Sequence, residues 1–277
     1  MIGTLFAQEF RISRKTFGTT VAVLLLVVIV SFAIAALRVP VIGPLFFGLG
    51  VIAAILNVPV MLGLLVEQYW RTMYGKEGYF TMSIPVRGRT LYWAKVLYAL
   101  VAVIVAVLVT LLGIAAAVVV FTYSQGQSLQ ASFDALRQAL GVLDPAAAWF
   151  IGVTMAVQLI FTVVAGSALM SIGARARFNH LGFGAPVVGG VILYFAMQIL
   201  GLAAMLFVPF GLRIAGPDTG AFVALGMWPE FAEQLQHPSS SGNPEVLGLG
   251  IVFVAIIATV WLAWAGVRSV ERHTSLR

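Results

Sequence analysis

Residues 96–122 read VLYALVAVIVAVLVTLLGIAAAVVVFT and contain no Asp, Glu, Lys or Arg. A helix of this length rises about 40 Å at about 1.5 Å per residue, which exceeds the roughly 30 Å hydrocarbon core of a bilayer. The run is apolar on every face, whereas a membrane β-strand has about 10 residues of alternating polarity. It therefore predicts a helix that crosses a membrane.

Five further runs have the same character. They are residues 17–37, 41–66, 146–172, 187–212 and 246–267. The 277-residue chain is 61% hydrophobic and only 9% charged, where an average soluble protein is about 25% charged. We therefore expect an all-α membrane protein with six transmembrane helices in a single domain. The first run exceeds the usual signal-peptide core of about 7–15 residues, so we expect it to be retained as a span.

The basic residues indicate how the spans are oriented. With the N-terminus in the cytoplasm, 13 of the 16 Lys and Arg residues lie on the cytoplasmic side, and the exceptions are Arg38, Arg137 and Arg213. The acidic residues are less biased, with four inside and six outside. Because Lys and Arg are retained on the cytoplasmic side, both termini are predicted to be cytoplasmic. The net charge of +6 is explained by this topology, and no nucleic-acid partner is expected.

Two segments outside the spans are predicted to be amphipathic helices. Within residues 1–16, polar residues recur at helical spacing, which indicates a helix in the cytoplasmic membrane interface. They are Thr4, Gln8, Arg11 and Lys15. Residues 128–141 repeat apolar side chains in the same way, with Ser128 as the N-cap, and predict an external helix. Residues 213–245 are expected to form an external loop.

The cytoplasmic loop of residues 67–95 is the most informative segment between the spans. Its centre, residues 74–86, reads YGKEGYFTMSIPV. Gly75 and Gly78 allow turns around a short helix, which Pro85 is expected to end. A solvated linker would favour Ser, Gly, Lys and Glu, whereas this loop is rich in aromatic residues. They either form an interfacial aromatic belt or dock a soluble partner, and composition leaves both explanations open.

Recognisable catalytic chemistry is absent from the sequence. It contains no P-loop, no His-Glu-x-x-His and no cysteine, and His180, His237 and His273 are far apart, so neither catalytic nor metal-binding residues are predicted. The apolar runs hold no ionisable residue. Their notable polar residues are Asn57, Gln158 and Gln198. These form either hydrogen bonds between helices or a weakly polar translocation path.

The predicted topology resembles that of a known family. Six spans, an amphipathic N-terminal segment and a large cytoplasmic loop between spans two and three resemble the membrane subunits of type-two ABC exporters. Residues 74–86 are similar to the Glu-Gly-Tyr-Leu-Thr…Leu-Pro-Val sequence of bacterial permeases of this kind. Phe80 and Ile84 stand here in place of the two leucines. The resemblance in topology covers the whole chain.

This resemblance implies a non-catalytic permease subunit, whose coupling helix between spans two and three contacts a separate ATPase. The contact residues would be Lys76, Glu77, Gly78, Tyr79, Phe80 and Arg87. The implied partners are two soluble ABC ATPase subunits, a second permease chain (identical or homologous) and membrane lipid. ATP and Mg²⁺ would be bound by the ATPase, and no cofactor by this chain. The implied location is the bacterial inner membrane.

Two other classes of function stay open on sequence grounds. A secondary carrier or channel driven by an ion gradient would need no ATPase. Such carriers usually place ionisable groups inside their spans, and the apolar runs have none. A membrane-embedded enzyme or an assembly factor is the other class, and no catalytic constellation supports the enzyme.

Overall fold

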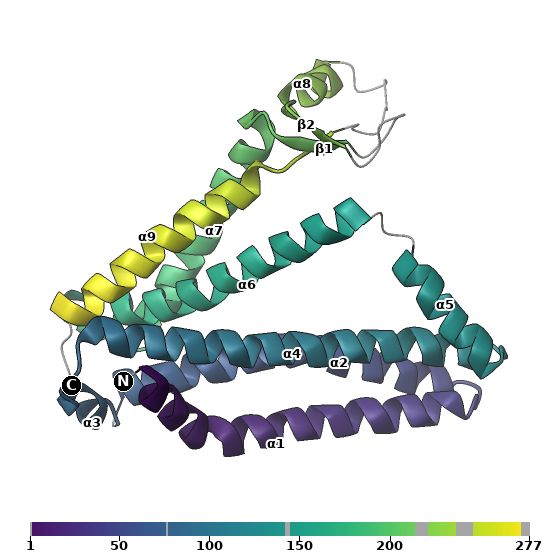
Figure 1. Ribbon diagram of the computed structural model, residues 1–277, viewed down its shortest axis with the longest axis horizontal. Helices are drawn as coiled ribbons and strands as arrows, with labels where there is room; N and C mark the ends of the chain where they lie inside the picture. Colours follow the sequence, from purple (N-terminus) through teal and green to yellow (C-terminus); the bar gives the residue numbers. More distant parts are fainter. Residues whose placement is uncertain (1, 76, 142–144, 214–220, 237–245, 273–277) are drawn as a thin grey trace. The chain divides into compact units, whose positions relative to one another are not determined.

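The computed structural model describes the chain except for residues 1, 76, 142–144, 214–220, 237–245 and 273–277. Among the described residues, six helices are long and apolar enough to cross a membrane, and helices dominate the ribbon in Figure 1. The prediction of a multi-pass, predominantly α-helical membrane protein is therefore confirmed. The chain divides into two compact units, residues 1–143 (with 276–277) and 144–275.

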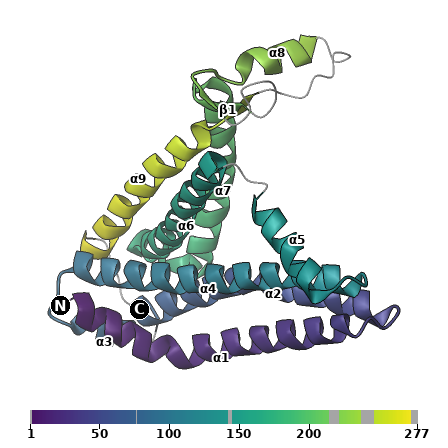
Figure 2. The ribbon, with the colours of Figure 1, turned by 45° about the vertical axis from the view of Figure 1, so that its right-hand side comes forward.

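Three long helices, which lie side by side in Figures 1 and 2, build the described part of the first unit. Its elements are α1 (Ile2–Ala36), α2 (Ile42–Met73), α3 (Gly78–Ser83), α4 (Gly88–Ser124) and α5 (Leu129–Gly141). The core of the unit is formed by Val28 and Phe32 of α1 with Ala53 and Ala54 of α2. Ala116, Ala117 and Val120 of α4 pack against it.

Small residues allow α2 and α4 to approach closely. A Cβ atom on Gly113 of α4 would lie 2.8 Å from the Cβ of Ala54 on α2, too close for two methyl groups. Gly113 and Ala117, four residues apart on α4, thus form a small-residue face that packs on the first unit's core. Helix α2 also continues through Pro59 without ending there.

Helix α1 differs from the expected separation into an interfacial segment and a span. It runs unbroken from Ile2 to Ala36, and the polar stripe predicted within residues 1–16 is exposed. Its other face is buried at intervals of four residues, at Leu5, Glu9, Ser13 and Phe17. Interfacial placement of the first turns stays a prediction, but these turns also pack against protein.

The described part of the second unit contains three long helices, one short helix and a small sheet. Its elements are α6 (Pro145–Gly173), a 3₁₀ turn (Ala176–Leu181), α7 (Gly184–Phe207), β1 (Gly211–Arg213), β2 (Phe222–Val223), α8 (Trp228–Gln236), β3 (Val246–Gly248) and α9 (Gly250–Arg272). Ser269 of α9 donates a 2.6 Å hydrogen bond from Oγ to the carbonyl of Ser171 on α6. Arg175 Nε donates to Ser269 Oγ at 3.1 Å.

The small sheet corrects the predicted ends of the last two spans. Helix α7 ends at Phe207 rather than at residue 212, because Pro209 favours extended backbone at Val208, which has ψ 120°. The chain then enters an antiparallel sheet of order β2-β1-β3. Helix α9 begins at Gly250 rather than at residue 246, since residues 246–248 pair with β1. Residues 213–245, expected to be a loop, also contain helix α8.

The predicted amphipathic helix at residues 128–141 is present as α5. The amide of Ala131 donates to Ser128 Oγ at 3.2 Å, which confirms the predicted N-cap. Leu129 and Phe133, on the predicted apolar face, are exposed. Whether α5 lies outside the cell stays a prediction.

Candidate functional site

Helix α3 follows α2 and precedes α4 along the chain. A short helix was predicted there, within the loop of residues 67–95. Helix α2 closes with two amides, those of Tyr74 and Gly75, which donate to the carbonyl of Trp70 at 2.8 and 2.9 Å. The amide of Gly78 then donates to the carbonyl of Gly75 at 2.9 Å, which turns the chain into α3. Ile84 is extended before Pro85, so α3 ends where the sequence predicted.

Two aromatic side chains project from this short helix. Tyr79 is 71% exposed and Phe80 is 75% exposed, and their rings meet edge to face with centroids 6.3 Å apart. Gly78, by contrast, is buried. Aromatic side chains are enriched both at membrane interfaces and in the centres of protein interfaces. The exposed pair is therefore a surface that a bilayer or another protein would cover.

Exposed charged residues flank this aromatic pair in the sequence. Arg71 Nε lies 3.5 Å from Glu77 Oε1, and both side chains are about half exposed. Arg87 and Arg89 are exposed at the start of α4. The predicted contact residues Glu77, Tyr79, Phe80 and Arg87 are thus all accessible. Gly78, also predicted to make this contact, is buried, and Lys76 lies outside the described residues.

A cluster of buried polar side chains joins the ends of α1, α2 and α4. Its members are Glu9, Ser13, Gln68, Thr72, Lys95 and Tyr98, all buried. The Lys95 ammonium donates to Glu9 Oε1 and, at 2.7 Å, to Thr72 Oγ1. Gln68 Nε2 donates to Glu9 Oε2 at 3.2 Å, so both carboxylate oxygens have donors.

A second branch of the buried cluster extends along α1. Ser13 Oγ lies 2.6 Å from Tyr98 Oη, and Ser13 also contacts the carbonyl of Glu9. The Tyr98 ring is stacked on Phe17, with centroids 6.2 Å apart, and meets Phe6 edge to face at 5.7 Å. Polar and aromatic contacts together fix the first turns of α1 against α4.

The sequence did not identify the buried cluster. Glu9 lies in the segment predicted to be an interfacial helix, and Lys95 lies at the end of the predicted cytoplasmic loop. The sequence did contain one indication of the cluster. Leu5, Glu9, Ser13 and Phe17 recur every four residues, so they share one helix face, and that face contains a single acidic residue.

The three polar residues of the predicted translocation path are in different surroundings. Asn57 is only 2% exposed and donates from Nδ2 to the carbonyl of Ala106 at 2.8 Å, which is a hydrogen bond between α2 and α4. Gln158 on α6 and Gln198 on α7 are exposed on the second unit. For Asn57, the interhelical explanation is therefore supported.

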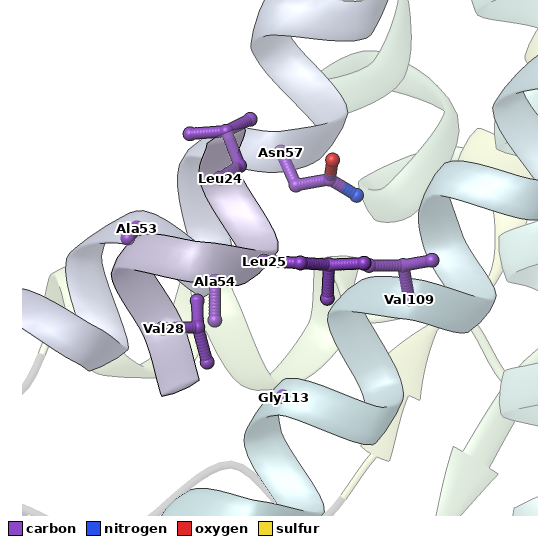
Figure 3. Close-up of a pocket in the computed structure, with 8 residues that line it drawn as sticks. All are labelled: Leu24, Leu25, Val28, Ala53, Ala54, Asn57, Val109 and Gly113. Carbon is purple, nitrogen blue, oxygen red and sulfur yellow. The ribbon is translucent and has the colours of Figure 1, made fainter. Parts of the chain in front are cut away.

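Asn57 also lies at a recess between α1, α2 and α4. Figure 3 shows the lining residues Leu24, Leu25, Val28, Ala53, Ala54, Asn57, Val109 and Gly113. All of them except Asn57 are apolar. Among the described residues, no group of three His, Asp or Glu side chains is placed to hold a metal ion.

Comparison with protein-family models, with curated proteins and with solved structures found no match to this chain. Its function is therefore argued from the site itself.

Proposed function

We propose that this chain is the membrane-spanning permease subunit of an ATP-driven ABC exporter, with α3 as its coupling helix. The main observation behind this proposal is that Tyr79 and Phe80 are each more than two-thirds exposed on a helix between two spans. A partner that covers both rings would remove considerable apolar area from water, at about 25 cal/mol per Å². The exposed arginines on either side of α3 in the sequence suit an acidic partner surface.

The buried cluster supports a mechanical role for α3. Helix α3 is joined to α2 through residues 74–77 and to α4 through residues 84–87. Thr72 and Lys95, near these junctions, are both bonded in the buried cluster that also holds Glu9 of α1. A force on α3 would therefore reach three spans through short connections, as a coupling helix requires.

The remaining parts of the proposal follow from the family resemblance. Two soluble ATPase subunits would bind ATP and Mg²⁺, and a second permease chain would complete the complex. The chain would lie in a bacterial inner membrane with both termini in the cytoplasm. It would be a non-catalytic subunit, whose spans change access when the ATPases close.

The proposal is tested by co-expression with a soluble ATPase that carries a Walker motif and is encoded beside this chain. We expect the two to co-purify, and Phe80→Ala and Glu77→Arg to abolish co-purification while the permease stays folded. Tyr194→Ala is a matched control, because Tyr194 and Phe195 form a similar exposed edge-to-face pair on α7. Equal loss with the control, or export by the chain alone, would overturn the proposal.

The buried ion pair favours a second candidate, an ion-driven secondary carrier. Lys95 and Glu9 are 4% and 8% exposed, and both belong to helices long and apolar enough to span a membrane. Such pairs occur in proton relays of transporters. A flux assay in proteoliposomes with only an ion gradient distinguishes the two functions. A carrier would show flux that Glu9→Gln abolishes, whereas the permease alone would show none.

A further inference from the structure

Helix α9 presents a continuous exposed stripe towards its C-terminal end. Its members recur at spacings of four, three, four and four residues, and they are Ile257, Trp261, Trp264, Arg268 and Arg272. At about 100° per residue, these five positions fall within about 80° of one another around the helix axis. They therefore share one face, which is apolar as far as Trp264 and basic beyond it.

The opposite face of α9 is held against α6 within the second unit. Ser269, in the last turn, donates from Oγ to the carbonyl of Ser171 at 2.6 Å. Arg175, just after α6, donates from Nε to Ser269 Oγ at 3.1 Å and adds a positive charge at this end of α9. These contacts fix the rotation of the last turn, so the exposed stripe points away from α6.

The length of α9 places the basic end of the stripe at the level of lipid headgroups. The helix has 23 residues, and residues 250–267 contain no Asp, Glu, Lys or Arg. A hydrocarbon core of about 30 Å takes about 20 helical residues, so Arg268 and Arg272 lie where the core ends. Trp264 lies one turn before them, at the depth where tryptophan is enriched in membrane proteins.

The basic end of the stripe is also hollowed. Trp264, Val267, Arg268, Glu271 and Arg272 line an open recess of about 290 Å³. Arg268 Cζ lies 5.1 Å from the centroid of the Trp264 ring, within the range of a cation-π interaction. The lining thus combines apolar surface with two guanidinium groups and one carboxylate, which gives it a net charge of +1.

This combination of groups selects among occupants. Guanidinium groups donate paired hydrogen bonds to phosphate oxygens. A soluble anion would satisfy the arginines but would leave Ile257 and Trp261 uncovered. A zwitterionic lipid would cover both, but its headgroup brings a second cation beside two guanidinium groups. An anionic phospholipid provides a phosphate without that cation, together with acyl chains for the apolar part of the stripe.

We propose that the recess and the apolar stripe beside it form a binding site for one anionic phospholipid. Its phosphate accepts hydrogen bonds from Arg268 and Arg272, and its acyl chains lie along Trp264, Trp261 and Ile257. Glu271 weakens the attraction, so the lipid exchanges with the bilayer. The site belongs to the second unit, and the inference does not rest on the proposed function, because it requires neither an ATPase nor a cargo.

Fluorescence quenching by brominated lipid tests the site in the full-length protein in nanodiscs. The probes are dibrominated phosphatidylglycerol, which is anionic, and dibrominated phosphatidylcholine with the same acyl chains, which is zwitterionic. The chain contains six tryptophans, so the signal of Trp264 is taken as the difference between each protein and its Trp264→Phe variant. We expect phosphatidylglycerol to bind beside Trp264 at least about fivefold more tightly, the effect of one net positive charge at a membrane surface.

Charge variants in the recess should shift this preference in opposite directions. Arg268→Gln should lower it about fivefold, and Glu271→Gln should raise it about fivefold, because each changes the net charge by one. Arg272→Gln repeats the loss at the second arginine, and folding is checked by circular dichroism and gel filtration. A folded Arg268→Gln or Arg272→Gln protein that keeps the full preference would contradict the assignment, as would a Glu271→Gln protein that loses it.

Arg38 provides a matched control on the first unit. It is exposed and its Cζ lies 4.3 Å from the centroid of the Tyr123 ring, but its guanidinium reaches the Gln127 carbonyl at 3.4 Å. Arg38→Gln should leave the preference at Trp264 unchanged. An equal loss in this control, or equal quenching by both lipids in the wild type, would overturn the proposal. Displacement of the brominated lipid by millimolar glycerol phosphate would assign the recess to a soluble anion and would overturn it too.

Discussion

Replacing Glu9 by leucine would leave the Lys95 ammonium buried without its carboxylate partner. Lys95 is 4% exposed, and its only other hydrogen-bond partner among the described residues is Thr72 Oγ1 at 2.7 Å. Breaking a buried ion pair on one side usually costs about 3–5 kcal/mol. Gln68 would also lose its acceptor, the Glu9 carboxylate. We therefore expect Glu9→Leu to reduce the free energy of unfolding by about 3–5 kcal/mol.

The double variant Glu9→Leu with Lys95→Met distinguishes the cost of leaving one buried charge unpaired from the cost of replacing both charges. Replacing both charges by apolar side chains is often close to neutral, so most of the loss should be recovered. The measurement is a double-mutant cycle by SDS titration in mixed micelles, followed by tryptophan fluorescence. Because Lys95→Met also breaks the pair and the double variant recovers most of the loss, we expect a coupling free energy of at least about 3 kcal/mol, at or above the upper end for contacting residues.

The exposed pair of Asp134 and Arg137 on α5 is the matched control. Its atoms lie 3.7 Å apart, and the side chains are 53% and 84% exposed. A surface pair contributes about 0–1 kcal/mol, so the same cycle there should give a coupling near zero. A coupling at Glu9 and Lys95 as small as in the control would refute the reasoning, as would a double variant as unstable as the sum of its single variants.

Three further predictions concern packing and capping. Gly113→Ala should destabilise the first unit by about 1–3 kcal/mol because its methyl would meet an alanine of α2, whereas Gly48→Ala in open space should not; the same SDS titration compares them. Ser128→Ala removes the N-cap of α5 and should cost about 1 kcal/mol, seen as faster amide exchange confined to α5. Gly250→Ala should lower the thermal midpoint because a Cβ there would overlap the Ala204 carbonyl, while Gly184→Ala, with open space around it, should leave the midpoint unchanged.

Much of the α-helical architecture followed from local sequence. The run of residues 96–122 could only form a helix in lipid, because a helix satisfies every backbone polar group within one segment. The ends of helices were less predictable. Residues 208–212 and 246–249 are as apolar as the spans beside them, and their strand pairing depends on contacts between segments distant in sequence.

The aromatic helix α3 was predictable in part. Gly78 and Pro85 placed its start and its end. The exposure of Tyr79 and Phe80 was not predictable, because the same aromatic residues also fit a buried position or a lipid interface. Nearby Tyr74 and Tyr69 are buried, although the loop composition did not distinguish them from the exposed pair.

By itself, the sequence determined that most of this chain lies in lipid as helices, since composition and run length are local properties. Only the tertiary structure brought Glu9 to Lys95, which is 86 residues away, and placed the Asn57 amide of α2 against the Ala106 carbonyl of α4. Both results depend on which helix faces meet. Apolar runs that are hydrophobic on every side do not specify those faces, because lipid and protein are equally good surroundings for them.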